Sequence, residues 1–442
     1  MASRARTCVA LALVLLAVGA VGASSGWTGF ATAPEAWHES DFQILWAAGH
    51  GLAEGVDITD PAALDRVGAR TGREATPFCA AQPLVTRLFG LSSDDFSAAY
   101  RAWLLLHALA GVLAVALLAG LLRDEGLTRA AALAVALAAV GLNDGLWMSL
   151  AMNSTNLVAL AAVCAAAWAA RRRRALSEGL ALALAVLAKT SPLLLVLVAA
   201  WSGRVRAASV GLLGWVAATL TALVWLGSAP LMAWMQRTAP ALGFAPARPE
   251  GAFDNSLHAW NLSPHGLLAR AGHRSDLPRV LVLALAAAVA LLVLWQLWLA
   301  VRARRDRPDG ALLTAAAVAG SLLVSSVTWP HHLVLAALPV ALLAARLRTA
   351  PLVCSLGLTA GVVLMLPLGL LDADPALSLE GPLRTAAAVV LFGALVAFPT
   401  GAGADADTGT GASEGSPGAR APAGGGAPRS VPSDAAPQGN AP

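Results

Sequence analysis

Lysine is nearly absent from this sequence of 442 residues: Lys189 is the only lysine, beside 29 arginines. Charged residues of both signs are also scarce, at 13%, whereas hydrophobic residues make up 57%. The net charge of +4 is too small to indicate nucleic-acid binding. A soluble chain of this length needs a larger share of polar surface. The composition therefore excludes a soluble globular protein and predicts an all-α polytopic membrane protein.

Cysteines and the motifs of soluble enzymes are few or missing. Cys8, Cys164 and Cys354 lie in apolar runs and Cys79 has no evident partner, so we predict no disulfide and no zinc site. The sequence has neither a Walker-type phosphate-binding loop nor an HExxH pair. A membrane enzyme without a cytosolic nucleotide site must take its activated substrate from the lipid phase or from outside the cell.

Long apolar runs fill most of the sequence, each near the length that crosses about 30 Å of hydrocarbon. They lie at about 99–122, 129–147, 154–170, 207–227, 279–301, 311–328, 331–346, 350–371 and 384–399. Arginine clusters separate them, and cytoplasmic loops carry an excess of arginine. We therefore predict a cytoplasmic position for Arg123 and Arg129, Arg171 to Arg174, Arg204 and Arg206, Arg302 to Arg307, and Arg346 and Arg348.

The stretch 178–201 has arginines beyond both of its ends, which places both ends on the cytoplasmic side. A single span cannot meet that condition. We predict a re-entrant helical hairpin with its turn at Lys189-Thr190-Ser191-Pro192, because proline disfavours helix at the preceding residue and Thr or Ser can satisfy freed backbone groups. The alternative is one long span with a proline kink.

The order of these segments predicts the organisation of the chain. Residues 1–23 form a first transmembrane helix, with a cleavable signal peptide as the alternative. Residues 24–98 form a long extracytoplasmic loop with interfacial helices, and 99–400 form a multi-span bundle. Residues 401–442, rich in Gly, Ala, Pro and Ser, form a disordered cytoplasmic tail. No internal repeat is visible, which counts against transporters built from duplicated halves.

Polar residues that interrupt the apolar context map almost entirely to the outer side of this topology. Asp41 lies just beyond the first helix, in HESDFQILWAAGHGL. An acid followed by such apolar residues suits an amphipathic helix at the membrane interface. The alternative is a structural role, in which Ser40 or Asp41 caps the helix.

Paired histidines mark the outer mouth between two later spans. Trp329, His331 and His332 occur there in VSSVTWPHHLVLAALP. Such histidines can bind phosphate, shuttle protons or simply lie solvated at the interface. Neighbouring side chains on a helix point about 100° apart, so at most one histidine serves a given site.

Two further polar stretches are weaker signals. FDNSLHAWNLSPHG combines Asn255, Ser256, His258 and Trp260, residue types that are common where sugars are bound, although other aromatic interfacial loops look similar. NSTN at 153–156 reads equally well as helix capping.

Taken in order, these segments resemble glycosyltransferase family 87, which contains polyprenyl-phosphate-mannose-dependent α-1,2-mannosyltransferases of actinobacterial envelope synthesis. The resemblance covers about residues 35–345 and rests on Asp41 with WAAG, GLALALAVLAKTSP, DNSLH and SSVTWPHH. It implies the GT-C fold, with an extracytoplasmic active site in a helical membrane bundle. The sequence departs from the family at CAAQPLV, residues 79–85, and at NSTN, where relatives show Tyr-Pro-Pro and Gly-Gln-x-Asn.

The resemblance also implies roles for individual residues. Asp41 matches the family's catalytic base, Lys189 its K-x-x-P motif, and Trp329, His331 and His332 its W-x-H-H motif. Asn255 and Ser256 match its asparagine-serine motif and, with His258 and Trp329, are expected to bind substrate. Lys189 and one histidine are expected to hold the donor phosphate, so no cofactor or metal is expected.

The predicted reaction moves a sugar from a polyprenyl phosphate to a glycolipid or lipoglycan, with inversion at the anomeric carbon. Mannose is the favoured sugar, and arabinose is the alternative. Two other classes of protein stay open at this point. A transporter or flippase of a lipid-linked sugar needs the same basic residues for phosphate but no base at Asp41. A non-catalytic subunit of an envelope-assembly complex needs none of these polar residues.

Overall fold

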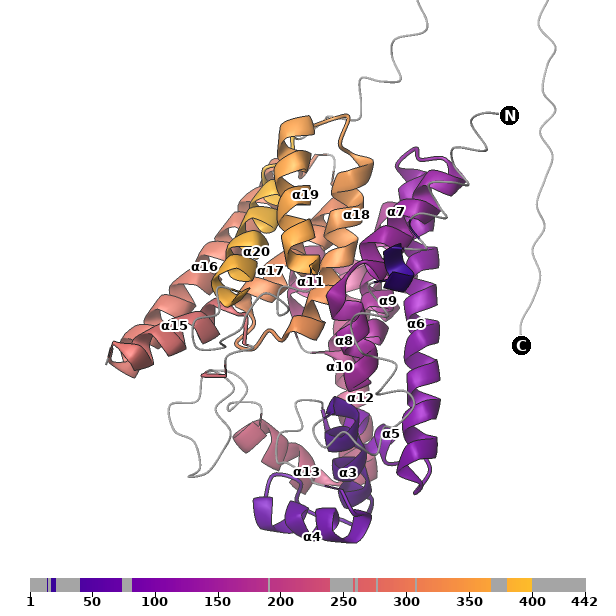
Figure 1. Ribbon diagram of the computed structural model, residues 1–442, viewed down its shortest axis with the longest axis vertical. Coiled ribbons are helices and arrows are strands. Elements are labelled where there is room, and N and C mark those ends of the chain that lie inside the picture. Colours follow the sequence, from indigo (N-terminus) through magenta and orange to yellow (C-terminus); the bar gives the residue numbers. More distant parts are fainter. Residues whose placement is uncertain are drawn as a thin grey trace, which may run out of the picture. The chain divides into compact units, whose positions relative to one another are not determined.

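The computed structural model describes residues 14, 17–20, 40–73, 82–189, 191–238, 257–258, 261–275, 277–306, 308–366 and 380–399. Within these residues every regular element is a helix (Figure 1). The predicted all-α fold is confirmed. The helix predicted for residues 1–23 lies almost wholly outside the described residues, and the tail predicted for 401–442 lies entirely outside them.

Three helices among the described residues are long and apolar enough to cross a membrane. They are α6 (Phe96–Asp124), α12 (Val205–Leu226) and α16 (Arg279–Ala303). Each exposes large aliphatic side chains along its length, such as Val112, Val224 and Val280. In water such faces would be unfavourable, whereas hydrocarbon solvates them. These helices therefore match three of the predicted spans.

A fourth predicted run, 129–147, is bent rather than straight. It forms α7 (Arg129–Gly141) and α8 (Asp144–Met152), whose axes differ by 58°. The Asn143 side chain accepts a hydrogen bond from the Gly145 amide at 2.9 Å and donates to the Leu333 carbonyl at 3.0 Å. This asparagine begins a new helix inside the apolar run and ties it to a distant segment.

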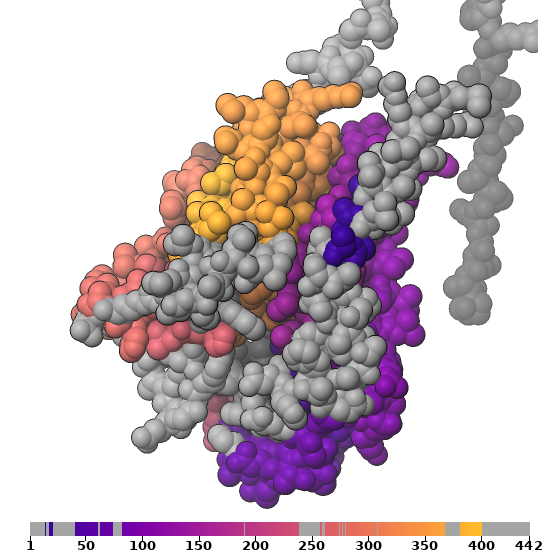
Figure 2. Space-filling model, in the orientation of Figure 1, coloured from indigo at the N-terminus to yellow at the C-terminus, as the bar shows by residue number. Residues whose placement is uncertain are grey.

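The remaining apolar runs form shorter helices. They are α9 (Asn156–Arg171), α17 (Gly310–Val324), η3 (Pro330–Ala336) leading into α18 (Ala337–Ala345), α19 (Pro351–Met365) and α20 (Glu380–Val396). Every residue of α17 from Gly310 to Leu323 is buried, so this helix forms the centre of the main core. Figure 2 shows the orange surface that includes α18 meeting the purple surface of α7, and both helices contribute buried residues to the main core.

The predicted hairpin is present as α10 (Ala175–Ala188) and α11 (Leu193–Trp201). Glu178, in the first turn of α10, forms an ion pair with Arg204, which follows the end of α11. The segment therefore leaves one end of the bundle and returns to that same end. The 14-residue α10 rises about 21 Å, which carries the turn at Lys189 well into the bundle.

A second, smaller core lies beside the start of α6. It is built by α3 (Asp41–Ala53), α4 (Pro61–Thr71) and α5 (Pro83–Phe89). The Phe42 ring is fully buried and its centroid lies 5.3 to 5.8 Å from those of Phe89, Phe96 and Tyr100. This aromatic cluster fixes the first turn of α3, and with it Asp41.

Glycine permits the close crossing of α3 and α5. A Cβ atom at Gly49 would lie 2.4 Å from the backbone nitrogen of Gly90, which no side chain can tolerate. Two further short helices complete this part of the chain, α13 (Ser228–Ala233) and η2 (Trp234–Thr238), whereas α15 (Pro264–Arg274) packs against α16. Arg237 of η2 reaches back to the Asp57 carboxylate at 3.1 Å. The loops of this region are thus joined to one another by direct contacts.

Ion pairs gather at the opposite end of the bundle. Arg346 lies 2.7 Å from both Glu125 and Asp309, and Arg172 lies 3.0 Å from Asp124. We call this the arginine-rich end, defined by Asp124, Glu125, Arg171, Arg172, Glu178, Arg204, Asp309 and Arg346. The other end, where α3 begins and the α10–α11 turn lies, is called the site end.

Candidate active site

Asp41 is the first residue of α3, and its neighbour Ser40 caps the helix. The Ser40 hydroxyl accepts a hydrogen bond from the Gln43 amide at 3.2 Å. The capping role left open for Asp41 therefore falls to Ser40. The carboxylate is free to face the site, at a helix N-terminus that favours negative charge.

His331 lies opposite this carboxylate. Its Nε2 atom is 3.5 Å from Asp41 Oδ2, and its side chain is only 7% exposed compared with 37% for Asp41. The backbone of η3 is fixed at this point, because the Ser149 hydroxyl donates to the His331 carbonyl at 3.0 Å. A buried imidazole and a more open carboxylate thus meet across two segments far apart in the sequence.

Lys189 brings a positive charge to the same place from the hairpin turn. Its Nζ atom donates to Asn156 Oδ1 at 2.8 Å. The Thr155 hydroxyl donates to the Ala188 carbonyl at 2.6 Å, which holds the end of α10 against the start of α9. The ammonium group acts electrostatically on Asp41 and on His331. The only lysine of the chain therefore belongs to a cluster with the other two candidate residues.

The acidity of Asp41 reflects this environment. Although 37% of the side chain is exposed, the surrounding protein displaces much of the water around the carboxyl group. This desolvation raises the pKa of Asp41 from 3.8 to about 6, although the charge of Lys189 acts to lower it. Removal from water disfavours the charged form, and here that effect outweighs the attraction of the ammonium group. A carboxylate with a pKa close to neutrality is suited to accept a proton from a substrate.

His332 packs against His331 and is hydrogen-bonded to the backbone of Trp329. His332 Nδ1 accepts the backbone N–H of Trp329 at 3.2 Å, so a neutral His332 carries its proton on Nε2. Its ring packs edge-on against His331, with centroids 4.6 Å apart. Of the two histidines, His331 is the one that contacts Asp41. His332 is held in place by the turn itself.

His258 joins the site through Trp329. The two rings pack edge-to-face with their centroids 4.9 Å apart. The chain just after His258 is tied to the segment before Trp329, because the Leu262 amide donates to the Thr328 carbonyl at 2.7 Å. His258 and Trp329, predicted as substrate-binding residues, therefore lie together. The other two, Asn255 and Ser256, lie outside the described residues.

Asn156 is the residue of the site that the sequence alone did not identify. NSTN was interpreted as helix capping, yet in the structure Asn156 holds the lysine, and its Nδ2 donates to Ser154 at 2.6 Å. Asn153 ends α8 in the left-handed conformation, with φ 49°. The sequence did offer one signal for this role: two asparagines interrupt an apolar run at about the membrane depth predicted for Lys189.

The site combines a proton acceptor, a cation and an imidazole. Among the described residues no group of three or more His, Cys, Asp and Glu side chains is placed to hold a metal ion. Lys189 is suited to bind an anion such as a phosphate, and Asp41 is suited to deprotonate a hydroxyl group. A base that deprotonates an attacking hydroxyl group and a cation that binds an anion suit a displacement in which the leaving group departs with a negative charge.

The sequence of the chain matches the model of a known protein family. The family model for Glycosyltransferase family 87 matches residues 76–326, which is more than half of the chain. No curated protein matches it. The matched range includes Lys189 and Asn156, whereas Asp41, Trp329, His331 and His332 fall outside it. The match thus covers the α10–α11 hairpin. The fold places Asp41 and His331, which lie outside the matched range, next to the hairpin turn.

Proposed function

The chain belongs to glycosyltransferase family 87 and is a membrane glycosyltransferase, and on that premise we propose that it transfers mannose from a polyprenyl phosphate. The acceptor is a hydroxyl group of a glycolipid or lipoglycan. The observation that carries this proposal is the meeting of Asp41 Oδ2 with His331 Nε2 at 3.5 Å, within the field of the Lys189 charge.

In the proposed reaction the acceptor oxygen attacks the anomeric carbon of the donor sugar. Asp41 takes the proton of the acceptor hydroxyl as the new carbon–oxygen bond forms. The bond between the anomeric carbon and the phosphate oxygen breaks, and polyprenyl phosphate leaves with the electron pair. A β-linked donor gives an α-linked product, because the attack and the departure occur on opposite faces of the sugar.

Lys189 and His331 stabilise the departing phosphate in this mechanism. Charge grows on the leaving oxygen as the bond breaks, and a fixed ammonium group in a site of low polarity stabilises that charge more strongly than water would. Asn156 holds the ammonium group in place from the side. Trp329 and His258 offer a ring face and a hydrogen-bonding group to the sugar or the acceptor.

The reaction is assigned to the extracytoplasmic face of the plasma membrane. The charged clusters that predict cytoplasmic loops lie at the arginine-rich end, in Arg171, Arg172, Arg204 and Arg346. The site end, opposite to them, then faces outward. A donor phosphate at the outer headgroup level lies within reach of a lysine at the tip of a hairpin that enters from the other side.

Sugar transfer from radiolabelled polyprenyl-phosphate-mannose in purified membranes tests the proposal. Asp41→Asn should reduce the rate roughly a hundred- to ten-thousand-fold, since it removes a general base while keeping the size of the side chain. Asp94→Asn is the matched control, because the Asp94 side chain is fully exposed. Full transfer by Asp41→Asn would remove this residue from the chemistry. Transfer of arabinose instead of mannose would correct the donor sugar and leave the mechanism standing.

A further inference from the structure

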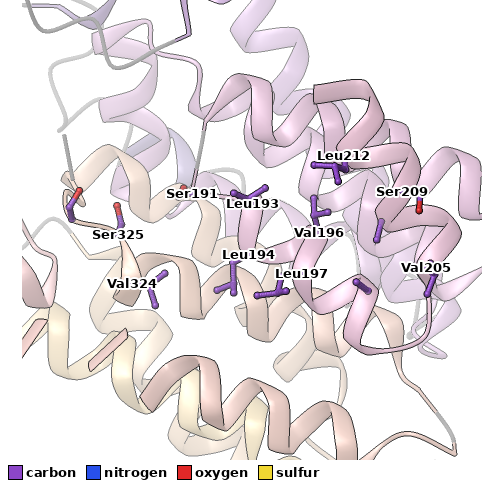
Figure 3. A pocket seen from close by; sticks show the side chains of 13 residues that line it. Ser191, Leu193, Leu194, Val196, Leu197, Val205, Ser209, Leu212, Val324 and Ser325 are labelled. Carbon is purple, nitrogen blue, oxygen red and sulfur yellow. The ribbon is translucent and has the colours of Figure 1, made fainter. Parts of the chain in front are cut away.

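A groove of about 720 Å³ runs between α11 and the beginning of α12. Figure 3 shows the side chains of Leu193 and Leu197 on one side, with Leu212 and Val205 on the other. These four side chains are exposed, although they are large and apolar. The groove is therefore open along its side to the hydrocarbon that surrounds α12.

The polar end of the groove is made by the segments that build the candidate site. Ser191, Ser325 and Ser326 lie there, and the first two are labelled in Figure 3. Ser191 follows Lys189 by two positions in the hairpin turn, and Ser326 precedes Trp329 by three. The groove thus begins at the turn that carries the candidate phosphate-binding lysine, and beyond that end Ser209 is the one polar residue among the described residues that line it.

We propose that this groove binds the isoprene units next to the phosphate of the donor lipid. The inference rests on the proposed function, because it takes the phosphate at Lys189 as its starting point. A ligand that has an anionic head and a branched apolar chain matches a polar end followed by an apolar channel. The acceptor lacks that order, since its reacting hydroxyl belongs to a sugar and not to the head of its apolar chain.

The size of the groove limits how much of the chain it holds. The nine residues of α11 rise about 13 Å, less than half of the roughly 30 Å of a hydrocarbon core. The groove therefore takes only the first isoprene units, and the rest of a long chain lies in the bilayer. Transfer efficiency should rise with chain length and then reach a plateau.

Binding in this groove positions the donor more than it adds affinity. Lipid tails are as apolar as leucine side chains, so moving a prenyl chain from the bilayer into the groove gains only packing contacts. Binding of the prenyl chain instead fixes the positions of the donor phosphate and the anomeric carbon in the site. Blocking the groove should therefore misplace the donor, with a loss of about tenfold in kcat/KM.

The test is a comparison of mannose donors of increasing prenyl length, from citronellyl to farnesyl, geranylgeranyl and decaprenyl phosphate. Ser209→Trp fills the groove from an exposed position of α12, and Ala217→Trp adds the same side chain at an exposed position of α12 outside it. We expect Ser209→Trp to lower kcat/KM about tenfold for geranylgeranyl and decaprenyl donors. Ser209 lies at the end of the groove far from Ser191 (Figure 3), beyond the two isoprene units of a citronellyl chain, so the citronellyl donor should show no such loss. The Ala217→Trp variant should show no loss with any donor.

Three results would overturn the inference while leaving the proposed function intact. They are an equal loss for short and long donors, a wild-type rate independent of chain length, and a change in the KM of the acceptor alone. The last result would assign the groove to an acyl chain of the acceptor.

A second measurement stands even if no mannose is transferred or the tryptophan variant misfolds. A prenyl phosphate with a diazirine in its first isoprene unit should label peptides from 191–212 in the wild-type protein, and excess unlabelled prenyl phosphate should prevent it. Labelling elsewhere, or labelling that excess prenyl phosphate does not reduce, contradicts the inference and indicates general contact with lipid. Absence of transfer from every donor, with specific labelling of 191–212, contradicts the proposed function alone.

Discussion

At the arginine-rich end, Arg346 donates hydrogen bonds of 2.9 and 2.7 Å to the two oxygens of Glu125 and also lies 2.7 Å from Asp309. At the site end, Asp41 and His331 meet through a contact of 3.5 Å, and Lys189 donates to a neutral amide. Arg346 and Glu125 are both 8% exposed, so solvent hardly screens this pair, whereas the Asp41 side chain is 37% exposed. The same bundle therefore pairs its charges closely at one end and loosely at the other.

This difference in the closeness of charge pairing follows from the structural role of the arginine-rich end and the proposed catalytic role of the site end. Arg346, a buried arginine with two carboxylate partners, keeps the ends of three helices together (α6, α17 and α18), and breaking such a pair is costly. A close ion pair between Asp41 and Lys189 would occupy the groups that the proposed reaction needs for the acceptor and the phosphate. A neutral partner such as Asn156 orients the ammonium group without neutralising it. Charge at the site end is thus held in position for a ligand.

After the loss of the base at Asp41, the largest expected effect on transfer comes from removing the single lysine. Lys189→Met should lower the transfer rate roughly a hundred- to a thousand-fold, because the leaving phosphate loses its fixed cation. Lys189→Arg should restore little of that activity, since the planar guanidinium does not fit a place shaped for a compact ammonium group. Arg206→Met, an exposed cation just after the hairpin, is the control. Strong rescue by Lys189→Arg would show that any positive charge suffices.

A smaller effect is expected from the partner of that lysine. Asn156→Ala should reduce transfer about tenfold, the value of a hydrogen bond to a charged group, because the ammonium group loses its orientation. The matched variant is Asn153→Ala, which removes a neighbouring asparagine that contacts His107 and not the lysine. The measurement is the KM of the donor beside kcat. Equal losses in the two variants would indicate a packing role for the whole NSTN segment.

Much of the fold was predictable from arginine positions and apolar runs. The return of 178–201 to its starting end was required by the arginines beyond both ends, and the Glu178–Arg204 ion pair confirms the hairpin. The bend at Asn143 was not predicted, because an asparagine inside an apolar run has no single meaning in a sequence. Its structural role depends on the Leu333 carbonyl, which is 190 positions away.

The candidate site was predictable as a set of residues but not as a geometry. Residue types and the family resemblance identified Asp41, Lys189 and His331, while the choice between His331 and His332 needed the structure. That choice depends on which ring contacts Asp41 and which ring accepts the Trp329 backbone N–H, and no sequence pattern encodes either contact. Asn156 was missed for a similar reason, since capping and lysine binding use the same side chain at the same position.

The pH dependence of transfer distinguishes the site end further. Only the ionised form of Asp41 accepts a proton, and its pKa is raised to about 6, so activity should increase as the pH rises through that value. At pH 5 kcat/KM should be about tenfold below its value at pH 7, because kcat/KM reports the free enzyme. An acid limb near pH 4, the range of an ordinary aspartate, would show that the carboxyl group is solvated in the working enzyme.

The smallest effect on transfer is expected at the arginine-rich end, although the effect on stability there should be large. Glu125→Ala leaves the buried Arg346 with one carboxylate partner and should destabilise the fold by about 3 kcal/mol. Transfer per folded molecule should stay within about twofold of wild type, since distant sites act almost independently. Thermal unfolding in detergent, beside kcat of the folded fraction, measures both quantities. If Glu125→Ala lowered kcat as much as Asn156→Ala does, the ion pairs at the arginine-rich end would be shown to control the geometry of the site end. The hairpin, whose Glu178 and Arg204 lie at the arginine-rich end, would then be the element that couples the two.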